Sequence, residues 1–297
     1  EDGDGGGVSV ECLYTGNVSE EEAHKFYAEV CSIVGAGRGD RAEPADWIPG
    51  TYRRLLDPGE QVDIAVQSEN TEDQSGAVLV TFQSQIYGFR GRASSSEESL
   101  VRSASLRLLS QMMREPLFDT LRTKQQLGYV VTSYYDVEFT APPDGPDATA
   151  VVVPVESLVV KVVSKVLPPP EVAARVDAFL LSFARTLEEM PGEEIAEGVA
   201  ALVEKLTRPP QNLGAEAAVH WGKIKKYAPE CCRAGEGGAE QLPWEVAAEL
   251  ADAIGGLKRD DLVRTFQEVV VGEGRSRVVS CVYGSQFPMV GDSDGAE

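Results

Sequence analysis

The chain has 297 residues and carries 27 Lys and Arg against 48 Asp and Glu, which gives a formal net charge of −21. This balance excludes a typical nucleic-acid-binding protein, because such a protein needs Lys and Arg to displace counterions from the phosphates. It also argues against binding to an anionic membrane surface. The length fits one large domain or two ordinary ones.

Histidine is scarce, with only His24 and His220, and they are too far apart in the sequence for an HExxH or HxxEH helix. Most hydrolytic zinc sites use two or three His ligands, so no metal site is predicted in this chain. Neither His accompanies a G-x-S-x-G elbow, which leaves a His-based triad without support. We read His24 as exposed or packing and His220 as packing.

The five cysteines include no C-x-x-C pair, and no apolar stretch reaches the ~18 residues of a membrane span. No signal-peptide pattern opens the sequence. We therefore expect a reduced intracellular protein, cytoplasmic and with free thiols. The adjacent Cys231 and Cys232 are read as structural rather than functional, because Arg233 is the one cation beside them.

In chain order, an acidic Gly-rich lead-in is followed by a strand pattern at Val8–Leu13. Ser19 and Glu22 form an S-x-x-E capping box that predicts a helix through about Val34. Residues 35–50 are rich in Gly, Pro and charge and predict a linker. Residues 1–60 are too few to form a domain with this content, and they are predicted to be the remnant of a preceding domain plus a linker.

A complete unit is predicted over residues 61–286, followed by a disordered acidic tail over 287–297. Its strands are expected at 62–67, 77–84, 127–135, 155–166 and 277–283, and residues 141–149 form a polar loop. Its helices are expected at 97–113, 116–125, 171–187, 193–207, 213–227, 243–254 and 259–270. Strands and helices that segregate in this way predict an α+β fold with a mostly antiparallel sheet.

The stretch Met113–Val131, MREPLFDTLRTKQQLGYVV, carries the most chemical information. Its neighbourhood is locally basic in an acidic chain, and a helix end bearing Arg122 leads through Gly128 into a strand beginning near Tyr129. A guanidinium and a phenol are donors suited to a substrate carbonyl or a developing oxyanion. The alternative is purely structural: Arg122 complements the helix C-terminus and Tyr129 packs half-buried.

This stretch resembles a signature of the insulysin/nardilysin branch of the pitrilysin family, which reads approximately E-P-x-F-x-x-L-R-T-x-x-Q-L-G-Y-x-V. Further similarity lies in RVDAFL at 175–180, LEEM at 187–190 and WGKI at 221–224, and the segment ECLYTGNV at 11–18 resembles the family's strand-to-helix turn. The likeness spans about Val10 to Tyr283, almost the whole chain.

The resemblance implies a specific architecture. Members of this family are zinc metallopeptidases with an inverted HxxEH motif and four homologous α+β domains in two halves. On this pattern the chain is the end of the third domain plus the fourth, with helices packed on one face of the sheet. Arg122 and Tyr129 match the Arg and Tyr that reach the substrate from the last domain.

The same resemblance implies what is missing from the chain. The zinc ligands and the water-activating Glu belong to the family's first domain, so this chain is expected to bind no cofactor and to be inactive alone. Its expected partners are a peptide substrate and a zinc-bearing N-terminal half. The alternative function is a non-catalytic scaffold or interaction module, and a truncated product without an independent role is a third possibility.

Overall fold

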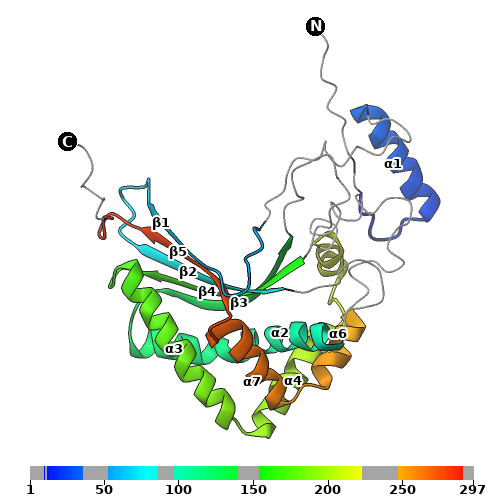
Figure 1. The fold of residues 1–297 in the computed structure, drawn as a ribbon. Coiled ribbons are helices and arrows are strands. Elements are labelled where there is room, and N and C mark those ends of the chain that lie inside the picture. Colours follow the sequence, from blue (N-terminus) through cyan, green and yellow to red (C-terminus); the bar gives the residue numbers. More distant parts are fainter. Residues whose placement is uncertain are drawn as a thin grey trace.

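The computed structural model describes residue 10 and residues 12–35, 53–85, 97–139, 154–222 and 247–289. Residues 213–222 are helical in addition to the elements named next, of which Figure 1 labels the α-helices and the strands. In chain order these elements are α1 (Glu20–Val34), β1 (Gln61–Gln67), β2 (Gly76–Gln85), α2 (Glu97–Leu117), the π-helical turn η2 (Phe118–Lys124), β3 (Val130–Phe139), β4 (Pro154–Ser164), α3 (Pro169–Glu189), α4 (Gly192–Thr207), α6 (Ala247–Gly255), α7 (Arg259–Phe266), the π-helical turn η3 (Gln267–Val271) and β5 (Ser276–Tyr283).

The five strands form one sheet in the order β1-β5-β2-β4-β3, so β1 and β3 are its edges. The pairs β5–β2, β2–β4 and β4–β3 are antiparallel, and β1 runs parallel to β5. The predicted mostly antiparallel α+β sheet is therefore confirmed. β5, the last strand, lies between β1 and β2, so the first and last strands of the sheet are hydrogen-bonded neighbours.

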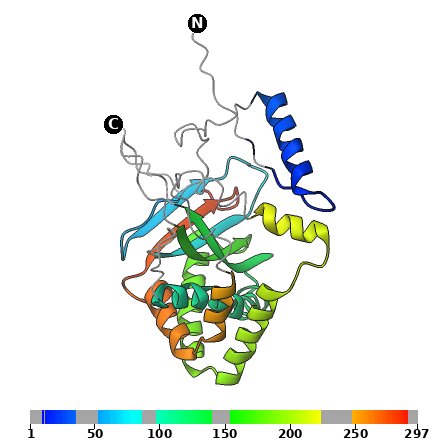
Figure 2. The same ribbon diagram turned by 90° about the vertical axis from the view of Figure 1, so that its right-hand side faces the viewer.

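One face of the sheet carries the core. Alternate residues of the central strands point to this face, as the period of a pleated strand requires; Val78, Val80 and Phe82 of β2 are at most 1% exposed. They pack against buried side chains of α2, α3 and α7. Figures 1 and 2 show α2, α3, α4, α6 and α7 gathered on this single side, as predicted.

The opposite face of the sheet, which we call the open face, is covered at one end by residues 53–56. The backbone N–H of Leu56 donates to the Gln83 side chain at 3.0 Å, and the Gln83 amide donates to the Arg54 carbonyl at 3.0 Å. Thr81, Gln83 and Val159 point to this face, yet all are at most 5% exposed. Arg53 also pairs with acidic side chains of β3.

Helix α1 and the helix at 213–222 lie to one side of the sheet (Figure 2). The predicted capping box is present, since Ser19 accepts from the Glu22 N–H and the Glu22 carboxylate accepts from the Ser19 N–H at 2.9 Å. α1 ends at Gly35, whose φ of 72° suits glycine. No residue of α1 is buried, and Phe26 and Ile33 are 53% and 78% exposed.

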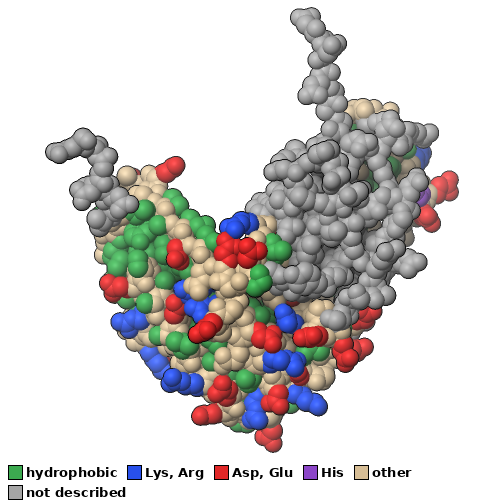
Figure 3. Space-filling view, viewed as in Figure 1, with side chains coloured by type: hydrophobic (Ala, Val, Ile, Leu, Met, Phe, Trp, Pro, Cys, Tyr) green, Lys and Arg blue, Asp and Glu red, His purple; other side chains and the backbone are tan. Residues whose placement is uncertain are grey.

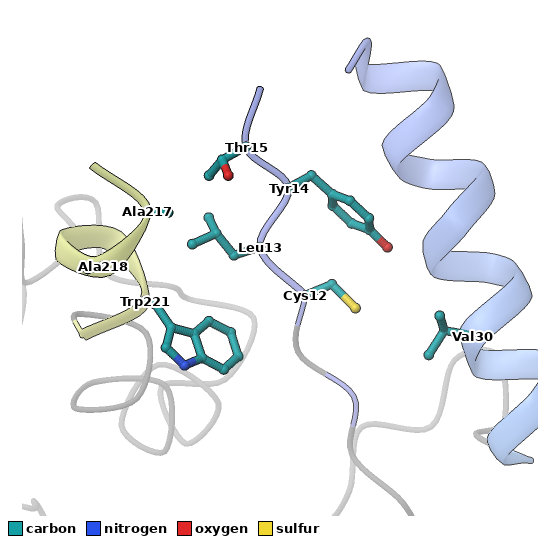
Figure 4. A pocket seen from close by; sticks show the side chains of 8 residues that line it. All are labelled: Cys12, Leu13, Tyr14, Thr15, Val30, Ala217, Ala218 and Trp221. Carbon is teal, nitrogen blue, oxygen red and sulfur yellow. The ribbon is translucent and has the colours of Figure 1, made fainter. Parts of the chain in front are cut away.

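Residues 12–15 pass between these two helices in an extended conformation. Cys12 and Tyr14 point toward α1, while Leu13 and Thr15 point toward Ala217 and Trp221 (Figure 4). The strand predicted at Val8–Leu13 is wrong for the described residues, none of which is in a strand. The alternating pattern is real, but it only half-buries Leu13 and Tyr14 between two helices, without a strand partner.

One predicted helix is wrong, and some predicted segments lie outside the described residues. α2 continues through Pro116 to Leu117 and passes directly into η2, so the separate helix predicted at 116–125 does not exist. Residues 141–149, 223–246 and 290–297, which include the predicted loop and most of the predicted tail, lie outside the described residues. Among the helices that the structure describes, none combines the length and apolar character needed to cross a bilayer.

Candidate functional site

The polypeptide changes its helical winding just before the candidate site. Pro116 has no N–H to offer the carbonyl one turn earlier, which weakens the α-helical ladder there. The next seven residues, Phe118–Lys124, are wound as a π-helix. The Gln125 N–H donates to the Thr120 carbonyl at 3.1 Å, five residues back. π-helical turns inside helices are rare and frequently occur at functional sites.

The link from this turn to β3 is sterically constrained. Gln126 has a φ of 55°, an uncommon value for a residue with a side chain. Leu127 is buried, and its N–H donates to the Leu121 carbonyl at 3.0 Å. A Cβ on Gly128 would lie 1.9 Å from the Val163 carbonyl oxygen, so only glycine fits against β4. The Q-L-G sequence therefore fixes where Tyr129 enters the edge strand.

A groove of about 590 Å³ lies between this helix and the edge strand. One wall is a single helical face with the spacing i, i+3, i+4 and i+7, and the other is the start of β3. The helical wall consists of Gln111, Arg114, Glu115 and Phe118, and the strand wall of Tyr129, Val130, Val131 and Thr132.

Tyr129 and Arg122 occupy different positions relative to this groove. Tyr129 lines it and is 61% exposed, so its hydroxyl is accessible to a ligand. Arg122 is exposed at its margin, with the guanidinium carbon 4.8 Å from the centre of the Phe118 ring. Phe118 is both a groove wall and the support of Arg122 through a cation–π contact. The structural alternative for Tyr129, half-buried packing, does not hold.

The groove and its margin carry two guanidiniums, those of Arg114 and Arg122, against one carboxylate, Glu115. Lys124 is neutralised by Asp119 at 2.7 Å, but among the described residues neither Arg114 nor Arg122 has a carboxylate within ion-pair distance. Both guanidiniums therefore keep their donors available for a carbonyl or carboxylate. Sequence reasoning missed the roles of Phe118 and Arg114, although their helical spacing from Arg122 and from each other carries the signal.

Behind the groove, buried polar groups join α2 to the strands. Ser103 donates to the Glu156 carboxylate at 2.6 Å, and the Arg107 guanidinium carbon lies 4.1 Å from the centre of the Tyr135 ring. Burial raises the pKa of the Tyr135 hydroxyl far above its usual value, and the nearby Glu156 raises it further. Tyr135 is therefore neutral at physiological pH and packs against Arg107 of α2 and the core.

The described residues do not fit a zinc site. They include no group of three or more His, Cys, Asp or Glu side chains that could hold a metal ion. His24 is exposed on α1 and has one acidic neighbour, Glu20, at 3.7 Å. His220 is exposed as well, contrary to the packing role expected for it.

Three comparisons bear on this fold and groove. The family model for the PQQ synthase PqqF-like C-terminal lobe domain 4 matches residues 108–140 and 149–221, which include η2 and all the residues that line the groove. Mouse insulin-degrading enzyme is 26% identical over 205 residues, covering 65% of this chain and 17% of the relative. The Arabidopsis thaliana insulin-degrading enzyme-like 1, peroxisomal, is 22% identical over 298 residues, covering 96% of this chain and 26% of the relative.

Among solved structures, the crystal structure of pitrilysin superposes with a TM-score of 0.64 at 21% identity and covers 95% of this chain and 25% of its own. This likeness shows a pitrilysin-type fold. The chain is homologous to insulysin-like members of the pitrilysin (M16) family and corresponds to a C-terminal part of them, as the sequence motifs implied. It spans only about a sixth to a quarter of the length of these relatives.

Proposed function

We propose that this chain is the substrate-binding portion of an insulysin-like zinc metalloendopeptidase and that it hydrolyses nothing alone. The observation that carries the proposal is the exposed Tyr129 directly before an edge strand, in a groove shared with Phe118, whose ring supports the Arg122 guanidinium. Tyr129 would donate its hydroxyl to the peptide backbone or to a developing oxyanion, and Arg122 would hydrogen-bond a substrate carbonyl.

The proposal places the zinc and the water-activating carboxylate outside this chain, in a partner half or in a further part of a longer polypeptide. The kinds of side chain around the groove support this assignment of substrate binding to this chain and of zinc chemistry to another part. The described residues supply cationic and hydroxyl donors around the groove but no cluster of metal ligands. The extent of domains also remains a proposal: residues 1–60 belong to a preceding domain, and 61–286 form the complete last one.

Peptide binding by the whole chain tests the site directly. Fluorescence anisotropy with a labelled extended peptide is expected to show binding that weakens in Arg122→Ala and Tyr129→Phe. Arg208→Ala and Tyr27→Phe are matched controls, because Arg208 is exposed at the C-cap of α4 and Tyr27 is exposed on α1. Equal binding by all five proteins would refute the assignment of Arg122 and Tyr129.

Catalysis is tested by mixing. The chain is expected to hold substoichiometric zinc in elemental analysis and to leave a fluorogenic peptide intact. Adding a separately produced zinc-bearing half should restore cleavage, and Tyr129→Phe should slow it by roughly 100- to 1000-fold, the usual effect of losing one preorganised oxyanion donor. Stoichiometric zinc with peptidase activity in the chain alone would overturn the proposal.

The second candidate is a non-catalytic interaction module of the same family. The observation that favours it is α1, which has exposed Phe26, Tyr27 and Ile33 and no buried residue. An apolar helix face of this kind is suited to a protein partner. The mixing experiment separates the two candidates, because a module of this kind would add no cleavage to the zinc-bearing half.

A further inference from the structure

The open face of the sheet carries an unbroken row of small apolar side chains across all five strands. The register pairs Val66 of β1 with Val282 of β5, Val282 with Ala77 of β2, Ala77 with Val163 of β4, and Val163 with Val130 of β3. Residues directly opposite one another in a sheet point to the same face. We call these five residues the apolar row.

The apolar row is accessible where it crosses the β1 side of the sheet. Val66 and Val282 are 51% and 39% exposed, and Ile64 beside them is 45% exposed. Figure 3 shows hydrophobic side chains gathered on the slope that carries β1, β5 and β2. The open face of a one-sided antiparallel sheet is ordinarily polar, so an exposed apolar strip here indicates a ligand.

We call the accessible part of the open face the strip. It is limited in extent, because residues 53–56 cover the other end of this face. Beyond this cover lie the apolar row and the next row along the strands, in which the apolar Ile64 and Leu79 stand among the polar Ser280, Lys161 and Thr132. Five strands spaced ~4.8 Å apart give a length of roughly 19 Å, and two rows give an area of roughly 250 Å². A stable dimer buries about 800 Å² per partner, so a second copy fits poorly.

The strip leads into the groove. Val130, the last member of the apolar row, also lines the groove with Tyr129. An extended chain advances ~3.3 Å per residue, so roughly six residues would span the strip from Val66 to Val130. A peptide held at Tyr129 can therefore continue directly across the strands.

One cation stands within this strip. Lys161 lies in the second row, opposite Leu79 on one side and Thr132 on the other, and it is exposed. It forms no ion pair with any residue that the structure describes. Its ammonium group offers a complement to one carboxylate in an otherwise apolar ligand.

We infer that the apolar row and Lys161 form an extended subsite for the apolar segment of a peptide, with one acidic residue placed near Lys161. The inference rests on the proposed function, since it deepens the same site by naming a substrate class. The peptide crosses the strands from the Tyr129 groove toward β1. Specificity comes from valine methyl groups, and the acidic preference comes from a single ammonium group.

The experiment measures anisotropy of a fluorescein-labelled octapeptide of alternating Val and Leu with one central Glu, against the full chain. Val66→Ser with Val282→Ser is expected to weaken binding about tenfold, because two exposed apolar contacts are lost. Leu181→Ser is the matched control, since Leu181 is 56% exposed on α3, on the other side of the sheet. Lys161→Ala should weaken the Glu peptide and leave its Gln counterpart unchanged.

The outcomes distinguish the subsite from the groove. If the valine variants bind like the wild type while Tyr129→Phe weakens binding, the subsite is refuted and the proposed function stands. If the valine variants weaken binding and Tyr129→Phe does not, the subsite stands and the groove assignment fails. Absence of binding by the wild type overturns both. Concentration-dependent dimers in sedimentation that vanish in the valine variants would identify a second copy as the occupant and overturn the peptide.

Discussion

Gly128 is the position where one added methyl group should disturb both the fold and the site. A Cβ there would lie 1.9 Å from the Val163 carbonyl oxygen and 2.8 Å from its carbonyl carbon. Carbon and oxygen atoms in close contact between strands are ~3.3 Å apart, so β3 and β4 would have to separate by more than ~1 Å at this point. Backbone atoms cannot rotate away as a flexible side chain can.

The expected cost of Gly128→Ala is about 3 kcal/mol of unfolding free energy, from overpacking plus weakened ladder hydrogen bonds. In urea titrations followed by circular dichroism, a slope of ~3 kcal/mol/M converts this loss into a midpoint about 1 M lower. Peptide binding should fall as well, because Tyr129 and Val130 follow directly in the chain. Gly192→Ala is the control, since its new Cβ would meet nothing within 4 Å. Equal midpoints for the two variants would refute the steric reasoning.

Three further predictions follow from the same region and from α1. A double-mutant cycle of Phe118→Ala and Arg122→Ala, measured by peptide affinity, should give a coupling of about 0.5–1 kcal/mol, because the ring supports the guanidinium; additive effects would contradict the cation–π contact. Leu121→Ala, at a side chain with 0% exposure in η2, should lower the unfolding free energy by about 2–5 kcal/mol in urea titrations; a loss under 1 kcal/mol would show that this turn is loosely packed. Hydrogen bonds from the Ser19 N–H and hydroxyl lower the pKa of Glu22, so this contact stabilises α1 above the carboxyl's ordinary pKa and is lost as pH falls through the lowered value. The amide-exchange protection factors of α1, which divide out the intrinsic slowing of exchange at acid pH, should fall in the wild type as pH drops through the lowered Glu22 pKa. Ser19→Ala should show low protection factors already near neutrality and a flatter pH dependence; an unchanged profile would mean that the cap contributes nothing.

Local elements could be predicted because their signals are local. The alternation at Val78, Val80 and Phe82 predicts a strand with one buried face, and the structure buries those three side chains. Likewise, the capping box of Ser19 and Glu22 lies at the start of α1, so the signal for this helix is in neighbouring residues. The extended segment at 12–15 shows the limit, since the same alternation occurs there without a strand partner.

The candidate site was only half predictable. The motif resemblance pointed to Arg122 and Tyr129, but the groove also depends on Pro116 and the π-helical turn that follows it. A π-turn shifts every later side chain around the helix, so helical periodicity alone does not show which residues face the edge strand. The i, i+4 spacing of Phe118 and Arg122 is visible in the sequence. Only the structure shows that Phe118 lines the groove and supports the Arg122 guanidinium.

The apolar row could not be predicted, because its members lie far apart in the sequence: β1 and β5 are at opposite ends of the domain in chain order. In sequence Val66 and Val282 each look like one residue of a half-buried strand. The sheet order places β5 between β1 and β2, and that order brings the two valines together on the exposed end of the open face. The segment at 53–56 covers the opposite end of this face, so the same arrangement that completes the core leaves an apolar path open toward Tyr129. The chain's net charge of −21 therefore says little about its ligand, because the strip presents valines and the exposed Lys161, and the groove presents Tyr129 with Arg114 and Glu115 on its facing wall.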